Sequence, residues 1–188
     1  MPDQWKQKRS TIRHYDQTTE TYDQQYMEEQ DLKITAALEF LTQPVDKNAL
    51  ILDAGCGTGI LFPHIAKKVK QIVGIDTSTK LLKKAKDNKV YCNTALIKAD
   101  ADFLPFKTET FTYTFAFTLL QNTPNPQGTV EETRRVTRRD ATLVITGLKK
   151  SFTQAAFVKL LEKARLEILA LKTDDALKDF VAICRKRL

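Results

Sequence analysis

Three glycines spaced two residues apart form the segment of the chain best suited to hold a ligand. Gly55, Gly57 and Gly59 follow a short apolar run at 49–52 and lead into a helix-like segment at 60–69. Glycine has no side chain and tolerates a positive φ, so a ligand can lie directly against such a turn. The N-terminus of the following helix offers free N–H groups and a partial positive charge. The segment therefore predicts a strand–turn–helix site for a nucleotide-like cofactor.

The spacing of these glycines argues against two common nucleotide sites. The dinucleotide fingerprint G-x-G-x-x-G needs a glycine where Ile60 stands, and a P-loop ends in Gly-Lys-Ser/Thr, which the turn lacks. The next expected strand, 71–75, leads to Asp76, about 20 residues after the glycines, where a carboxylate can accept hydrogen bonds from ribose hydroxyls. We therefore expect a ligand with a ribose and without a pyrophosphate.

A second acidic strand tip follows along the chain. The short apolar run at 95–98 leads to Asp100, whose carboxylate could accept a hydrogen bond from an adenine amino group. The carboxyl ends of parallel strands meet at one edge of a sheet, where ligands bind. The glycine turn, Asp76 and Asp100 therefore predict a single adenosine-binding cleft.

At these three places the chain resembles a known family. LDAGCGTG at 52–59, VGIDTS at 73–78 and ADADFLPF at 99–106 resemble motifs I, II and III of class I S-adenosylmethionine (SAM)-dependent methyltransferases. The ubiquinone/menaquinone-methyltransferase-like (methyltransferase type 11) group is the nearest match, and the resemblance covers 49–147. It implies SAM as cofactor and a Rossmann-like α/β fold. That fold has a seven-stranded, mostly parallel sheet with helices on both faces, a final antiparallel strand and an N-terminal helical lid.

Carried over residue by residue, the resemblance implies contacts at all three strand tips. Asp53 would orient the turn and the amino group of the cofactor, and Asp76 would hold the ribose hydroxyls. Thr77 would lie beside adenine, while Asp100 and the backbone of Ala101 would read its edge. The full set of implied cofactor contacts is Asp53, Gly55, Cys56, Gly57, Gly59, Asp76, Thr77, Asp100, Ala101 and Phe117.

One position departs from the family pattern. The family's fourth strand usually opens with an acid after Phe, whereas Thr112 follows Phe111 at the start of the expected strand 112–117. The departure keeps a second interpretation open. The chain could be a non-catalytic SAM-binding or scaffold subunit of a methyltransferase complex.

Methyl transfer from a sulfonium releases a neutral thioether, so alignment of donor and acceptor is the main requirement. A general base is needed only if the acceptor holds a proton at neutral pH. Tyr15, on a helical stripe with Ile12, Thr19, Tyr22 and Tyr26, is a candidate to cap the cofactor and face the acceptor. The stripe could equally serve to pack on the sheet.

Three further residues are candidates for contact with the acceptor. His14 could be a base or an ordinary surface histidine. Gln121 and Asn122 lie in a loop rich in Asn and Pro, where the family often contacts its acceptor, although an ordinary loop cap would look the same.

The elements needed to position these residues can be read from apolar spacing. Expected helices lie at 10–28, 31–41, 60–69, around Ala85, at 130–138 and at about 156–164. Expected strands lie at 49–52, 71–75, 95–98, 112–117, 141–146, 166–170 and 180–184. This alternation predicts a mostly parallel sheet covered on both faces. With 188 residues the chain should form one compact domain, with a lid at 1–44 and the SAM-binding part at 45–188.

The net charge of +7 allows an anionic partner. Four arginines at 134, 135, 138 and 139 are expected on one helix, away from the cleft. Six other basic residues could surround the acceptor side: Lys6, Lys8, Arg9, Arg13, Lys149 and Lys150. We therefore expect a small-molecule acceptor or RNA, with some preference for the small molecule, and a partner subunit could complete the acceptor site.

The composition argues against several other classes. An apolar run near 20 residues is missing and the N-terminus is polar, so neither a membrane span nor a secretory signal is expected. Three cysteines without a C-x-x-C pair, together with only two histidines, argue against a disulfide framework and a metal site. A cytoplasmic enzyme is the expectation.

Overall fold

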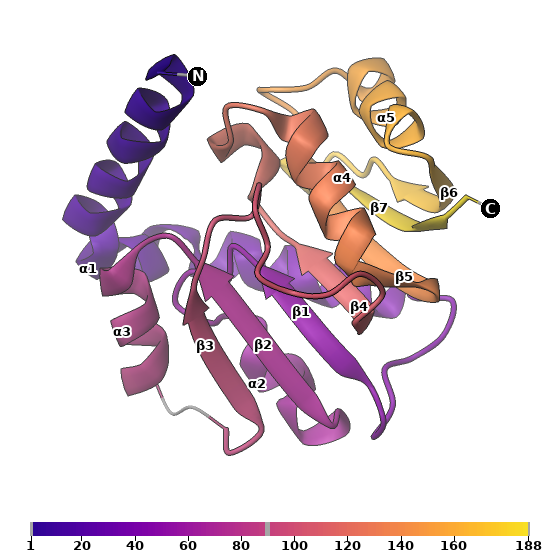
Figure 1. The fold of residues 1–188 in the computed structure, drawn as a ribbon, viewed down its shortest axis with the longest axis horizontal. Coiled ribbons are helices and arrows are strands. Elements are labelled where there is room, and N and C mark those ends of the chain that lie inside the picture. Colours follow the sequence, from indigo (N-terminus) through magenta and orange to yellow (C-terminus); the bar gives the residue numbers. More distant parts are fainter. Residues whose placement is uncertain (1, 89–90, 188) are drawn as a thin grey trace.

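A computed structural model describes the backbone of residues 2–88 and 91–187, and their side chains except those of residues 2, 3, 14, 16 and 18–26. Its centre is a seven-stranded sheet in the order β3-β2-β1-β4-β5-β7-β6 (Figure 1). The strands are β1 (Leu50–Ala54), β2 (Gln71–Asp76), β3 (Thr94–Lys98), β4 (Phe111–Ala116), β5 (Thr137–Leu148), β6 (Leu166–Lys172) and β7 (Asp179–Lys186). Strand β7 runs antiparallel to both of its neighbours, whereas β3, β2, β1, β4 and β5 pair in parallel. The expected sheet is confirmed, including its antiparallel strand.

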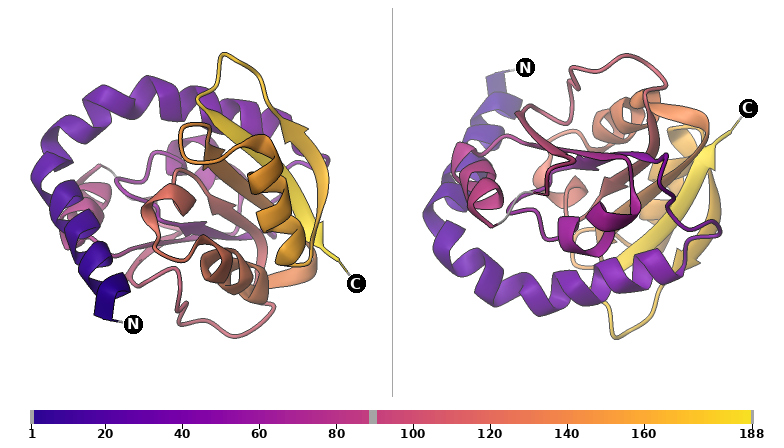
Figure 2. Two further views of the ribbon diagram at one scale, coloured as in Figure 1. Left: turned by 90° about the horizontal axis from the view of Figure 1, so that it is seen from above. Right: turned by 90° about the horizontal axis from the view of Figure 1, so that it is seen from below.

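Helices cover both faces of the sheet. They are α1 (Pro2–Glu39), α2 (Phe62–Ile65), α3 (Thr79–Asp87), α4 (Pro126–Val136) and α5 (Gln154–Lys163), with 3-10 turns η1 (Ala66–Lys68) and η2 (Leu120–Asn122). Figure 2 shows α1 and α2 on one face and α4 and α5 on the other. In the same views α1 is a long curved helix that continues past the edge of the sheet next to α3. Helix α1 is in contact with α3. None of the described helices is long and apolar enough to cross a membrane.

The alternation of side chains along β5 explains why both faces are covered. Leu143 and Ile145 pack on one side with Phe157 of α5, while Val144 packs on the other with Ile34 of α1. Each of these five residues is at most 2% exposed. A strand buried on both faces requires a continuous apolar run, as observed in 143–145.

The segment between β3 and β4 contains no described helix, and α4 holds it in place. The guanidinium of Arg135 donates to the carbonyl oxygens of Phe106 (2.8 Å) and Leu104 (3.0 Å), and also to the Glu132 carboxylate. Glu132 in turn accepts a hydrogen bond from the Leu104 backbone N–H (2.8 Å). Arg135 therefore stabilises the segment that carries Asp100.

The structure corrects the expected boundaries at the N-terminus. One continuous helix of 38 residues replaces the two expected at 10–28 and 31–41. Between Pro2 and Pro44 the sequence contains neither glycine nor proline, so nothing in it interrupts the helix. The expected helix at 60–69 is shorter, a single turn of α2 followed by η1, with Pro63 in its first turn.

A second correction concerns the arginines expected on one helix. The helix α4 ends at Val136, and both Arg138 and Arg139 belong to β5. The hydroxyl of Thr137 donates to Thr133 O (2.6 Å) and contacts the hydroxyl of Thr114 on β4 (2.7 Å). These contacts and pairing with β4 extend β5 directly from the end of α4.

Candidate functional site

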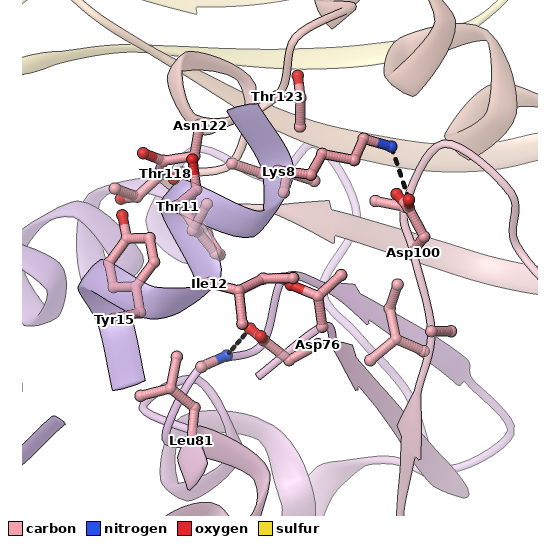
Figure 3. A pocket seen from close by; sticks show the side chains of 18 of the residues that line it. Lys8, Thr11, Ile12, Tyr15, Asp76, Leu81, Asp100, Thr118, Asn122 and Thr123 are labelled. Atoms are coloured by element: carbon pink, nitrogen blue, oxygen red, sulfur yellow. Dashed lines mark hydrogen bonds and ion pairs between the residues drawn. The ribbon is translucent and has the colours of Figure 1, made fainter. Parts of the chain in front are cut away.

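A cavity lies at the carboxyl ends of β1, β2, β3 and β4, where the sequence predicted the cleft. It encloses about 720 Å³, a volume that includes open solvent at its mouth. Figure 3 shows its lining residues, with Asp100 on one side and Tyr15, Thr118 and Asn122 grouped on the other. Of the residues expected from the sequence, it brings together Tyr15, Gly55, Gly57, Asp76, Thr77, Asp100, Ala101, Phe117 and Asn122.

The glycine turn is held against the end of β2. The backbone N–H groups of Gly55 and Cys56 both donate to Ile75 O, at 2.9 and 2.8 Å. Gly55, Gly57 and Gly59 have φ values of 76°, 54° and 81°, which disfavour any other residue. A Cβ at Gly59 would lie 2.6 Å from the Phe62 ring, and Gly59 lines neither described cavity. Gly59 therefore closes the turn, while Gly55 and Gly57 face the site.

The carboxylate of Asp76 connects β2 to the glycine turn. Its two oxygens accept hydrogen bonds from the backbone N–H groups of Gly57 (3.0 Å) and Ser78 (2.8 Å). Each carboxylate oxygen has two lone pairs and can accept more than one hydrogen bond, as contacts with ribose hydroxyls require. The side chain faces the cavity, as Figure 3 shows.

Lys8 of α1 closes one side of the cavity over Asp100. Its Nζ lies 2.6 Å from a carboxylate oxygen of Asp100 and 2.6 Å from one of Asp102. It also lies 5.4 Å and 5.5 Å from the ring centroids of Trp5 and Phe103. Burial alone would lower the pKa of Lys8, but the hydrogen bonds to both carboxylates outweigh it and raise that pKa. Lys8 was expected as a cation facing the acceptor; the structure pairs it with two acids instead.

Helix α1 turns one stripe of side chains into the cavity. Lys8, Thr11, Ile12 and Tyr15 all line it, at the i, i+3, i+4 and i+7 spacing of a single helix face. His14 and the remaining expected members of the stripe, Thr19, Tyr22 and Tyr26, lie outside the described side chains. The contribution of α1 to the site is therefore described from Lys8 to Tyr15.

A second, smaller cavity adjoins the first across the glycine turn and Phe117. It encloses about 350 Å³ with its opening, and its lining includes Gln30, Asp53 and Cys56. Burial, and secondarily the charge of Asp76, raises the pKa of Asp53 to about 8. Burial likewise raises the pKa of the Cys56 thiol well above its usual range, which fits a small packing residue.

Thr118, at the tip of β4, is a site residue that the sequence reasoning missed. Its φ of 53° is unusual for a β-branched residue, and it lines the first cavity. The hydroxyl of Thr146 accepts from its backbone N–H (2.9 Å), and the side-chain amide of Asn122 donates to its carbonyl (2.7 Å). Thus Asn122 acts on the shape of the β4 tip as well as lining the cavity.

A buried ion pair on α1 and β7 contacts the same threonine. Lys33 Nζ donates to the Thr118 hydroxyl (2.8 Å) and lies 2.6 Å from Asp179 Oδ2. The Gln30 amide is within hydrogen-bond distance of the same hydroxyl, at 2.9 and 3.0 Å. Burial raises the pKa of Asp179, and the charge of Lys33 offsets part of this effect. The sequence contains one sign of this cluster, because the polar residues Gln30 and Lys33 lie on the same helical stripe as the apolar residues Ile34 and Ala37.

Other expected residues lie away from the cavity. Gln121 does not line it, and its buried Oε1 has no hydrogen-bond partner among the described residues. Thr112 lies at the opposite end of β4, where its hydroxyl accepts from Leu50 N–H (2.9 Å). The missing acid at 112 therefore does not alter the cavity. Lys149 donates to the carbonyl oxygens of Thr173 and Asp174 rather than facing the site.

The residues present fit an adenosyl group. The turn offers bare backbone at positive φ, and a Cβ at Gly55 would lie 3.0 Å from Leu119 Cδ1, so a side chain would compete for this space. Two carboxylates, Asp76 and Asp100, face the same cavity. Among the described side chains no group of three or more His, Cys, Asp or Glu could hold a metal ion.

Relatives of known sequence support this fit. A family model described as a methyltransferase domain matches residues 52–145. An uncharacterized Methanocaldococcus jannaschii protein is 30% identical over 71% of this chain and 49% of its own length. A 2-methyl-6-phytyl-1,4-hydroquinone methyltransferase of Oryza sativa is 31% identical (47% and 26%), and an 18S rRNA (guanine-N(7))-methyltransferase of Bos taurus is 36% identical (43% and 28%). The chain spans half or less of the length of these relatives.

Solved structures agree with the fold. A Haloferax volcanii structure, described as a complex between the Trm112 methyltransferase activator and a methyltransferase, superposes with a TM-score of 0.80. It is 13% identical, over 94% of this chain and 98% of that one. With the match to the family model over 52–145, the chain belongs to the class I SAM-dependent methyltransferases.

Proposed function

We propose that this chain transfers a methyl group from SAM to a small-molecule acceptor. The observation that carries the proposal is the convergence of the positive-φ glycine turn, Asp76 and Asp100 on one cavity. In this proposal Asp76 holds the ribose, and Asp100, Ala101 and Thr77 surround adenine. The amino-acid end of the cofactor extends over the glycine turn toward Asp53 in the second cavity.

Bound SAM supplies a methyl group on a sulfonium, whose C–S bond breaks with the electron pair staying on sulfur while the acceptor's lone pair forms the new bond. The chain's own task is alignment and exclusion of water, which can account for a large part of the rate. Tyr15 and Asn122 are the proposed acceptor contacts on the side opposite Asp100. In this proposal the lid expected at 1–44 consists of the N-terminal turns of α1, whose residues line the cavity as far as Tyr15.

The electrostatics of the cavity support a small and uncharged acceptor. Lys8 is the cation that lines the cavity, and Asp100 and Asp102 neutralise it. Tyr15, Thr118 and Asn122 make the opposite side neutral and polar. A site built for a phosphate backbone would present cations without such partners.

An RNA acceptor is the second candidate. Lys6, Arg9 and Arg13 are exposed along one face of α1, and a relative of this chain is named as an rRNA methyltransferase. A scaffold role with a partner subunit is the alternative without catalysis. The Haloferax volcanii complex with an activator favours including a partner in any assay.

Calorimetric titration with SAM tests the binding part of this proposal. We expect Asp76→Ala to weaken binding roughly 10- to 100-fold, since hydrogen bonds to a charged group contribute about 1.5–3 kcal/mol. Asp87→Ala, at an exposed acid on α3, is the matched control and should bind like the wild type. Equal affinity in all three proteins would refute the assignment of the cofactor site.

The activity is tested separately with radiolabelled SAM. Transfer of label to a pool of small molecules, and not to rRNA or tRNA, would support the small-molecule acceptor. Transfer to RNA would replace it with the second candidate. Tight SAM binding without transfer to either pool would favour the scaffold role.

A further inference from the structure

Thr118 adopts a costly conformation at the place where the two cavities meet. A β-branched residue at φ 53° persists only where the surrounding structure holds it. Thr118 lines the first cavity, and Gln30, which contacts its hydroxyl, lines the second. The preceding residue, Phe117, lines both. Strain of this kind is concentrated at functional positions.

Every polar atom of Thr118 is held by another part of the molecule. Thr146 of β5 accepts from its N–H, Asn122 of η2 donates to its carbonyl, and Lys33 of α1 donates to its hydroxyl. Three separate elements therefore fix the orientation of one side chain. The threonine can neither rotate nor shift without loss of these bonds.

The buried ion pair behind Thr118 has a large desolvation free energy, which mere support of a loop would not require. Lys33 and Asp179 are both 0% exposed, and Asp179 has no hydrogen-bond partner among the described residues besides this charge pairing. Desolvating two charges often costs more than their attraction returns, so apolar residues would hold the tip of β4 at least as well. A charged donor does, however, fix and polarise the hydroxyl that it contacts.

We propose that Thr118 packs against the transferring methyl group and shapes the position of the acceptor atom, and that Lys33 is a positioning residue acting through it. The proposal rests on the proposed function. With ribose at Asp76 and adenine at Asp100, the reactive part of the cofactor comes to lie on the opposite side, where Figure 3 shows Thr118 beside Tyr15 and Asn122. This neutral polar surface fits an uncharged amine nitrogen, whose lone pair forms the bond to the methyl carbon and whose product cation then releases its proton to solvent.

The environment of the methyl group can be observed without knowing the acceptor. The probe is SAM labelled with ¹³C in its methyl group, whose resonance in the bound state reports what lies against it. Thr118→Val removes the hydroxyl and keeps the β-branched shape. The double variant Lys33→Met/Asp179→Asn removes both charges together, which avoids leaving a lone buried charge. The control is Lys178→Met, because Lys178 contacts Glu29 at the exposed edge of the same cluster.

We expect SAM affinity within about threefold of wild type in all three variants. The bound methyl resonance should be displaced by more than its linewidth in Thr118→Val and in the double variant, and unchanged in Lys178→Met. If the double variant does not fold, as judged by circular dichroism, Gln30→Met replaces it. That variant removes the amide contact with the hydroxyl, and because Gln30 also lines the second cavity, its displaced resonance counts only if its SAM affinity stays within the same threefold range.

Two results would overturn the proposal. One is a wild-type resonance in the folded Thr118→Val protein. The other is a tenfold or greater loss of SAM affinity in that variant, which would place Thr118 in cofactor binding instead. Failure of the wild-type protein to bind SAM is a different outcome, since it rejects the proposed function itself and leaves no cofactor for Thr118 to face.

Discussion

Asp53 lies beneath the glycine turn at the end of β1 and is 3% exposed. Its pKa in the folded protein is raised to about 8 by burial and by Asp76, against about 3.9 in an unfolded chain. Between these two values the folded protein keeps a proton that the unfolded chain has released. Stability of the cofactor-free protein therefore falls as pH rises through this window.

Asp53→Asn tests this titration, because asparagine mimics the protonated acid. We expect the variant to unfold at a temperature close to wild type at pH 4, and roughly 5–10 °C above it at pH 9, corresponding to a few kcal/mol. Thermal unfolding followed by circular dichroism measures both. Asp87→Asn, at an exposed acid, should track wild type throughout. A constant difference between Asp53→Asn and wild type across pH would contradict the assigned titration.

The residues that a sequence reveals are those with a local pattern. Asp76 and Asp100 follow short apolar runs, so their place on strand tips could be predicted. Thr118 could not be found in this way, because its partners on α1 are 85 and 88 positions away along the chain. For Lys33, the sequence indicates only a charged residue within an apolar helical stripe. Its partner Asp179 could not be predicted, because it lies near the other end of the sequence.

At the scale of elements, α1 combines two tasks in one helix. Its later turns supply Ile34 and Ala37 to the core, while its first turns reach the cavity and are tied down by Lys8. Lys8→Met should release the first turns and leave the core intact. We expect amide hydrogen exchange over residues 4–13 to accelerate roughly tenfold, since about 1.5–3 kcal/mol of charge-assisted bonding is lost.

Exchange measured by mass spectrometry should show no change over the central strands. Lys6→Met, at an exposed lysine two positions earlier, is the matched control. Equal exchange in the Lys6 and Lys8 variants would show that the ion pairs do not hold α1 in place.

Element boundaries were predicted less well than element order. The alternating pattern gave all seven strands, because apolar runs between turns are a local signal. The extension of β5 back to Thr137 was missed, since it depends on the Thr114–Thr137 contact across the sheet. The prediction of two N-terminal helices was wrong because two apolar stripes were interpreted as two helices. No glycine or proline separates the stripes, so the chain forms the single helix α1.

At the scale of the whole molecule, the charge of +7 should act on polyanions without directing the chemistry. We expect binding of a random single-stranded RNA to weaken on the order of tenfold or more between 50 and 200 mM salt, as counterion release requires. SAM affinity should change less than about twofold over the same range. Fluorescence anisotropy and calorimetry measure the two. RNA affinity that persists at 200 mM salt would instead favour the RNA acceptor.

Trp5 is the single tryptophan of the sequence, and it lies beside Lys8, which lines the cavity, with 54% of its surface exposed. Its indole emission comes from one position and responds to the nearby ammonium group and to water. The unlabelled protein thus contains an optical reporter next to a residue of its site. Stopped-flow mixing can follow ligand arrival and departure there in real time.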